Sequence, residues 1–286
     1  MKIAYLGQHG SHSEEAVFDF FGEAESVSCP SFETVFDAVE SGECDSAMIP
    51  IENSLAGSVH QNYDLLVRHK LFIVGETVLQ IHHCLIGLPG ATINELTRVT
   101  SHPQALAQCA RYLRSLQVQV QPAADTASSV KDLGSHGDRT MAAIGSRRAA
   151  EIYKMEVLAE GIEDDPANST RFLAIARNPV TPSGEAKTTA VFTLINQPGA
   201  LLKVLGCFAA REIDITKIES RPIQDKLWEY LFYIDFIGAV TDSNVEKALE
   251  DLRKVTLTWR VLGSYPRYNG RTDSGDKQSR AAVLPE

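Results

Sequence analysis

Residues 168–172 read Asn-Ser-Thr-Arg-Phe, and they lead into the apolar run Leu-Ala-Ile-Ala that ends at residue 176. They offer an amide, hydroxyl groups, a guanidinium and an aromatic ring within one short segment. The acidic, turn-prone residues before them and the apolar residues after them predict the entry of a buried strand. Because α/β proteins bind ligands at the ends of strands, this junction is a candidate ligand site. The alternative is a polar strand entry with an exposed arginine.

Length and charge narrow the class of protein. The chain has 286 residues, enough for one large domain or two modest ones. Its 44% hydrophobic and 22% charged content is that of an ordinary folded protein. The net charge of -10 argues against nucleic acid and anionic membranes as partners. An anionic substrate would therefore have to be held by local groups.

The apolar runs, the start of the chain and the cysteines predict the protein's compartment and the redox state of its thiols. It contains no apolar run of about 18 residues, so no membrane-spanning helix is expected. The start of the chain reads as a strand, which predicts a cytoplasmic protein, or a plastid stromal one if a presequence was removed. The cysteines are scattered and form no CxxC pair, so we expect reduced, buried thiols and no metal site. They are Cys29, Cys44, Cys84, Cys109 and Cys207.

A strand, a turn bearing Ser or Thr and then a helix recur at four places. These turns are residues 52–58, 101–104, 125–129 and 145–146. Each one alone is an ordinary helix cap. Together they predict a largely parallel sheet whose helix N-termini lie at one edge, where backbone N–H groups attract carboxylates. A small anion is the predicted ligand. The first loop lacks a GxGxxG pattern, so dinucleotide binding is disfavoured.

Several side chains near these turns have two interpretations. Glu52 is either a first-turn acid favoured by the helix dipole or a group that orients a neighbour or transfers a proton. Ser101 is expected to cap a helix, and His102 could donate to an anion. His82 and His83 are adjacent on an apparent strand and should point to opposite faces, so a metal site there is disfavoured.

A Pro-, Gly- and Ser-containing linker at residues 178–184 predicts a second folded unit. The pattern that follows reads strand, helix, strand, strand, helix, strand, which is the ferredoxin-like βαββαβ order. With no evident nucleophile or acid–base pair, this unit is predicted to bind a ligand without catalysing a reaction. Residues 267–286 are polar and are expected to be disordered.

Six strings, in order, resemble those of prephenate dehydratases that carry a C-terminal ACT domain. They are PIENSLAGSV (50–59), SHPQALAQC (101–109), DTA (125–127), NSTRF (168–172), GALL (199–202) and ESRP (219–222). The resemblance covers about residues 1 to 266. Three further strings look closest to the arogenate dehydratase branch, namely NYDLL (62–66), AEGI (159–162) and YLFYIDF (230–236).

The resemblance implies an α/β fold with a two-lobed, periplasmic-binding-protein-like (type II) catalytic domain and a ferredoxin-like βαββαβ ACT domain. The implied catalytic domain covers residues 1–178, with lobe A at about 1–78 and 155–178 and lobe B at about 79–154. The chain would pass between the lobes near residue 78 and again within residues 155–170. The implied ACT domain covers residues 187–266, followed by the polar tail. The active site would lie in the cleft between the lobes.

The implied reaction is a decarboxylating dehydration by a carbon–oxygen lyase. Prephenate becomes phenylpyruvate, or arogenate becomes phenylalanine, with loss of CO2 and water, and no metal or organic cofactor is needed. The implied catalytic residues are Thr170, Glu52, Asn53, Ser101 and Gln108, and the implied substrate-binding residues are Ser54, Thr126, Arg171 and Phe172. A non-catalytic protein that senses a small anion or an amino acid is the alternative, which the absence of a signal peptide and of a helix-turn-helix disfavours.

The ACT motifs imply feedback regulation by L-phenylalanine in a homodimer or homotetramer. The implied phenylalanine-binding residues are Asn196, Gly199, Ala200, Leu201, Leu202, Glu219, Ser220 and Arg221. The first loop departs from the family pattern, because His12 stands where the family usually has Phe or Tyr. The contacts of this loop are therefore left open.

Overall fold

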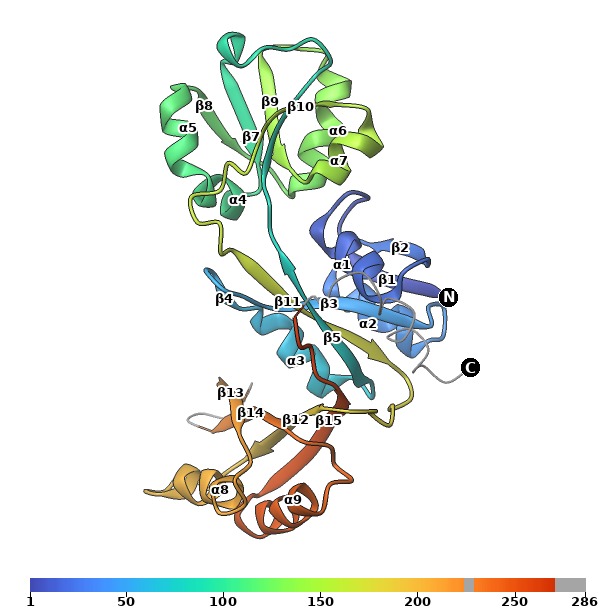
Figure 1. The fold of residues 1–286 in the computed structure, drawn as a ribbon, viewed down its shortest axis with the longest axis vertical. Helices are drawn as coiled ribbons and strands as arrows, with labels where there is room; N and C mark the ends of the chain where they lie inside the picture. The colour runs from blue at the N-terminus through green and yellow to red at the C-terminus, as the bar shows by residue number, and fades with distance from the viewer. Residues whose placement is uncertain (224–228, 271–286) are drawn as a thin grey trace. The chain divides into compact units, whose positions relative to one another are not determined.

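The computed structural model describes residues 1–223 and 229–270 (Figure 1). The chain divides into two compact units, one formed by residues 1–62 and 77–172 and the other by residues 63–76 and 173–286. The expected disordered tail lies, from residue 271 onward, outside the described residues. No helix in the described part of the chain is long and apolar enough to cross a membrane. All five cysteines are free and buried, as expected.

The first sheet contains the N-terminal strands in the order β2-β1-β3-β11-β5, with the short strand β4 paired to β3. Its strands are β1 (Lys2–Leu6), β2 (Glu25–Cys29), β3 (Ser46–Asn53), β4 (Gly57–Ser58), β5 (Phe72–Gln80) and β11 (Ser169–Ala176). The helices between them are α1 (His12–Phe21), α2 (Phe32–Glu40) and α3 (His60–Arg68). Strand β1 is parallel to β2 and β3, as βα units require. Ser31 caps α2 as expected, with its side chain accepting from the Thr34 N–H.

The second sheet has the order β10-β6-β9-β7-β8. Its strands are β6 (Cys84–Gly87), β7 (Arg98–Ser101), β8 (Gln119–Pro122), β9 (Met141–Gly145) and β10 (Glu156–Glu160). The helices are α4 (Pro103–Gln108), α5 (Ala110–Leu116), α6 (Thr126–His136) and α7 (Arg147–Tyr153), with a 3-10 turn at Ile93–Glu95. Helices α4 and α5 bury one face of the sheet around Val99 and Ile144, and α6 and α7 bury the other around Ile86 and Ala143 (Figure 1).

The two-lobed α/β expectation is confirmed, and strand β10 extends the second sheet a few residues beyond the approximate lobe boundary taken from the motifs. Strand β10 pairs antiparallel with β6, from Glu156 opposite Gly87 to Glu160 opposite Cys84. Residues 156–160 therefore belong to the second sheet, and the chain returns to the first sheet only between Glu160 and Ser169. Local sequence gave no sign of this strand, because its partner lies far away in the chain.

The C-terminal sheet confirms the ferredoxin-like order. Strands β12 (Ala186–Thr193), β13 (Ile215–Pro222), β14 (Tyr230–Ile237) and β15 (Thr258–Pro266) alternate with helices α8 (Ala200–Ala209) and α9 (Ser243–Val255). The strand order is β13-β14-β12-β15, and each neighbouring pair is antiparallel. One core joins both helices to the sheet through Phe192, Phe208, Phe236 and Leu252.

Residues 63–76 belong to the same compact unit as the C-terminal sheet, although the motif-based boundary placed them in the catalytic domain. The Tyr233 hydroxyl donates to the Tyr63 carbonyl at 2.5 Å. Arg221 forms an ion pair with Asp64 at 2.9 Å. The end of α3 and the start of β5 thus pack with the β12–β15 sheet, and this grouping follows from contacts that no linker composition predicts.

Candidate active site

The first expected strand-to-helix turn is a β-hairpin. Strand β3 continues to Asn53 and turns back into β4, with Glu52 opposite Ser58 and Asn53 opposite Gly57. Gly57 has φ +82°, a backbone conformation that side chains rarely adopt. Glu52 is therefore not a first-turn helix acid, and the prediction of a helix cap at this place is wrong.

The side chain of Asn53 is held in one orientation. Its Oδ1 accepts from the backbone N–H groups of Leu55 at 3.1 Å and Ala56 at 2.9 Å. Its Nδ2 donates to Asn168 Oδ1 at 2.8 Å and to Thr170 Oγ1 at 2.9 Å. Because an amide oxygen only accepts and an amide nitrogen only donates, the hairpin amides decide which end of Asn53 faces Thr170.

This orientation decides what the Thr170 hydroxyl can do. Thr170 accepts a hydrogen bond from Asn53, so its own O–H proton is left to donate to another oxygen. Both side chains are buried, where an uncompensated polar group is costly. Asn168 is fully buried beside them, and its Nδ2 has no partner within the part of the chain that the structure describes. We call Asn53, Asn168 and Thr170 the amide–hydroxyl cluster.

Ser54 ties the hairpin to the strand that carries Thr170. Its backbone N–H donates to the Ser169 carbonyl at 2.8 Å, and the Ser169 N–H donates to Ser54 Oγ at 3.0 Å. Ser54 itself is exposed. The structure thus brings the 50–59 and 168–172 motifs together through Ser54 and Ser169, which are 115 positions apart in the chain.

Arg171 and Phe172 follow Thr170 on β11 and take different positions. Successive side chains of a strand point to opposite faces, so Arg171 projects away from the face of Thr170. Phe172 is 2% exposed and lies in the hydrophobic core. Thr170 and Arg171 therefore lie on opposite faces of β11, which does not support binding of one substrate group by both side chains. Phe172 contributes to the hydrophobic core.

Three more expected site residues lie at the second sheet. Ser101 ends β7, is fully buried and donates to the Ile144 carbonyl at 2.7 Å. It does not cap α4, because His102 does so by accepting from the Gln104 N–H at 3.2 Å. Gln108 is the last residue of α4, and Thr126 is the first residue of α6. No described contact joins these three side chains to the amide–hydroxyl cluster.

The remaining two strand-to-helix turns behave as predicted. Asp125 caps α6 by accepting from the Ser128 N–H, and Ser146 caps α7 by accepting from the Ala149 N–H. Ser146 also donates to the Gly10 carbonyl at 2.5 Å. This last contact links the first loop to the helix that follows β9.

The first loop and the start of α1 pack closely against α7. Gly10 has φ +86°, and a Cβ placed there would lie 2.6 Å from the Ala149 Cα. Glu14 is 2% exposed and accepts from the Gly10 N–H at 2.7 Å and from Arg148 Nε at 3.3 Å. The loop therefore joins the two lobes of the first compact unit.

Glu14 is the buried carboxylate at this contact. Burial alone would raise its pKa, but hydrogen bonds from the Gly10 N–H, His9, Ser26 and Arg148 outweigh burial and lower the pKa below its usual value. Glu14 is therefore ionised at neutral pH and pairs with Arg148 across the two lobes.

Two buried residues close to the expected site were not predicted. Asn168 lies in the NSTRF motif but was not assigned to the site, and His83 contacts Gln108 from a distant part of the chain. His83 was expected on a strand, but it lies between β5 and β6, where His82 is exposed and His83 is buried. Each residue pairs with a motif amide that lies elsewhere in the chain, Asn168 with Asn53 and His83 with Gln108, so local sequence carries no signal for either.

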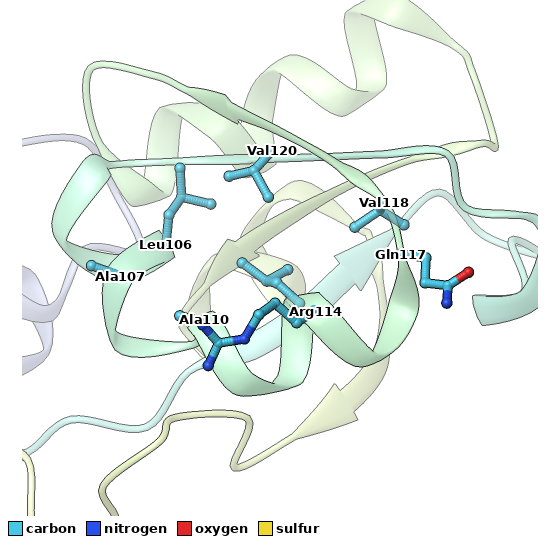
Figure 2. A pocket seen from close by; sticks show the side chains of 8 residues that line it. Leu106, Ala107, Ala110, Arg114, Gln117, Val118 and Val120 are labelled. Carbon is cyan, nitrogen blue, oxygen red and sulfur yellow. The ribbon is translucent and has the colours of Figure 1, made fainter.

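A groove of about 580 Å³ lies beside α4 and α5 (Figure 2). Leucine, alanine and valine side chains form most of its lining, with Arg114 and Gln117 at its polar side. None of the expected catalytic or substrate-binding residues lines this groove. It is separate from the candidate active site.

The two α/β lobes and the ferredoxin-like unit define a two-lobed α/β protein with an appended βαββαβ module. The prephenate dehydratase profile matches residues 3–180, and the ACT domain profile matches residues 188–254. Over 277 residues the chain is 44% identical to arogenate dehydratase/prephenate dehydratase 2, chloroplastic, from Arabidopsis thaliana. That alignment covers 93% of this chain and 73% of the relative. The chain therefore belongs to the prephenate/arogenate dehydratase family with a C-terminal ACT domain.

Two solved structures are similar to this chain over most of their length. A prephenate dehydratase from Arthrobacter aurescens in complex with L-Phe is 34% identical, with a TM-score of 0.86, and the match covers 93% of this chain and 90% of that one. GqqA, described as a novel type of quorum quenching acylase, is 33% identical with a TM-score of 0.88, covering 94% and 99%. Family membership makes the chain a carbon–oxygen lyase of phenylalanine biosynthesis.

Proposed function

We propose that the amide–hydroxyl cluster performs the decarboxylating dehydration, with Thr170 hydrogen-bonding the hydroxyl that leaves the substrate ring. The hydrogen bond from Asn53 Nδ2 to Thr170 Oγ1, at 2.9 Å, is the observation that carries this proposal. It occupies Thr170 as an acceptor and leaves its proton available to another oxygen. A donor held in this way can stabilise the developing charge on a departing hydroxide.

The proposed reaction balances in atoms and electrons without a cofactor. The ring carboxylate leaves as CO2, and the electron pair of that carbon–carbon bond enters the ring. The carbon–oxygen bond of the ring hydroxyl breaks, and the hydroxide takes one proton to leave as water. Aromatisation of the ring drives both steps, so the protein must orient the substrate and stabilise the leaving oxygen.

The proton for the leaving hydroxyl is proposed to arrive through water. A threonine hydroxyl is a poor acid, so Thr170 can align the leaving group but cannot supply the net proton. Glu52 precedes Asn53 on β3 and projects from the opposite face of that strand, which favours water over Glu52 as the immediate donor.

The substrate carboxylate is proposed to be held near the second sheet. Thr126 opens α6 next to the capping Asp125, and its hydroxyl is proposed as a donor to the substrate carboxylate. Ser101 and Gln108 frame the same lobe and are proposed to complete the site. The net charge of -10 does not attract an anionic substrate, so polar groups at the site must bind its carboxylate locally.

Supplying prephenate and arogenate separately tests this assignment. We expect phenylpyruvate from the first, phenylalanine from the second, and CO2 from both, since both substrates share the reacting ring. Product would be followed by absorbance and by amino-acid analysis. Absence of turnover with both substrates would contradict the proposal, and turnover of one alone would identify the side-chain group that the site requires.

L-phenylalanine is proposed as the effector of the ACT unit. Gly199 precedes α8 with φ +79°, and Asn196, Gly199 and Leu202 are exposed there. Glu219, Ser220 and Arg221 lie on β13, an edge strand of the sheet. The homologous structure with L-Phe supports this assignment, and a homodimer or homotetramer would cover such an edge. The cytoplasm or the plastid stroma is the proposed compartment, and the chloroplastic names of plant relatives support the second.

We expect phenylalanine to raise Tm and to lower activity, because a ligand that binds the folded state stabilises it. Gly199→Ala and Glu219→Gln should weaken both effects. Gly184→Ala is the matched control, since Gly184 has a similar φ of +78° and equally open surroundings but lies in the linker. Calorimetric titration and inhibition assays provide the measurement. No heat and no inhibition with the unaltered protein would contradict the sensor role.

A further inference from the structure

His83 is a buried histidine in direct contact with a proposed catalytic amide. It is 2% exposed, and its Nε2 lies 2.9 Å from Gln108 Oε1. The two residues are 25 positions apart in the chain. The adjacent His82 has an exposed ring and hydrogen-bonds Glu163 instead.

The contact determines the tautomer of His83 and the orientation of Gln108. An amide oxygen can only accept, so the hydrogen in this contact must come from His83 Nε2. His83 Nδ1 is then the unprotonated nitrogen, and it has no partner among the described residues. Burial lowers the pKa of His83, so the ring is neutral at physiological pH.

Both residues are also held through their main chains. The Asp164 N–H donates to the Gln108 carbonyl at 2.6 Å, and the His83 N–H donates to Glu163 Oε2 at 2.9 Å. The His12 ring packs edge-on against the His83 ring, with centroids 5.7 Å apart and an interplanar angle of 71°. His83 therefore has little freedom to turn away from Gln108.

We infer that His83 is a positioning residue that holds Gln108 with its amide nitrogen available to the substrate. With Oε1 engaged by His83, the amide nitrogen of Gln108 remains as a donor, and it has no partner among the described residues. A donor in a fixed direction can bind a substrate oxygen without losing rotational freedom in the transition state. The inference rests on the proposed catalytic role of Gln108. It also gives His12 a role, which is to support the His83 ring.

Two substitutions of His83 separate the hydrogen bond from simple packing. His83→Met fills the site with an apolar side chain of similar length and removes the donor, and we expect kcat to fall about tenfold because the Gln108 amide can rotate. His83→Gln places an N–H donor near the former Nε2 and should restore most of that loss. His82→Met is the matched control, and it should leave kcat within about twofold of the unaltered enzyme because the His82 ring is solvent-exposed.

A double-mutant cycle with Gln108→Met tests whether His83 acts through Gln108. We expect His83→Met to lower kcat/KM less than about twofold when Gln108 is already methionine, because the amide it positions is gone. A structural defect would instead multiply the two losses, and Tm of each variant would report it. Unchanged activity of His83→Met, or fully multiplicative losses, would overturn the inference while Gln108 kept its role. Unchanged activity of Gln108→Met would overturn both that role and the inference.

Discussion

Replacing Thr170 with valine is expected to lower kcat at least about tenfold while the fold stays intact. Valine has nearly the shape of threonine, so the packing on β11 is retained. The substitution removes the hydroxyl that accepts from Asn53 and that is proposed to donate to the leaving oxygen. It also leaves one buried Asn53 N–H less well satisfied, which costs about 1–3 kcal/mol of stability. That cost is small enough for folded protein to remain.

Steady-state kinetics and thermal unfolding would be measured on the same preparations. Thr170→Ser is the control, because serine keeps the hydroxyl on the same strand and should retain most of kcat. Turnover of the valine variant equal to that of the unaltered enzyme would remove Thr170 from the mechanism. A large loss in both variants would point to packing of the threonine methyl group instead of the hydroxyl.

Replacing Gly10 with alanine is expected to produce the largest loss of stability. The backbone of Gly10 has φ +86°, and the added Cβ would lie 2.6 Å from Ala149 Cα and 3.0 Å from its nitrogen. Such a contact is with backbone, so the first loop and α7 must separate. The Ser146–Gly10 and Arg148–Glu14 contacts depend on the same approach. Together, the strained φ and the overpacking should cost about 2–5 kcal/mol.

Gly137→Ala is the matched control for this prediction. Gly137 has φ +65° in the left-handed region at the end of α6, and nothing lies within 4 Å of a Cβ placed there. It should show only the cost of a left-handed backbone, about 1–2 kcal/mol. Urea denaturation of both variants gives the comparison. Equal losses would show that the loop moves away from Ala149 without cost, and that the two lobes are not held at this point.

Local sequence was enough for the elements whose signals are local. Ser31 and Asp125 cap the helices that their positions predict, because capping depends on residues within one turn. The βαββαβ order after residue 186 follows from alternating apolar runs and turns, and it is observed. The family motifs likewise named Asn53, Thr170 and Gln108 as candidates.

Interactions between distant segments had to come from the folded chain. The hairpin at Glu52 and the placement of β10 beside β6 depend on hydrogen-bond partners that local patterns do not specify. The orientation of the Thr170 hydroxyl is set by Asn53, 117 residues earlier, and the placement of Gln108 beside His83 arises in the same way. Motifs reveal which chemical groups are present. Which end of an amide meets which hydroxyl is decided only when packing removes the other orientations, because each buried donor and acceptor must find its partner there.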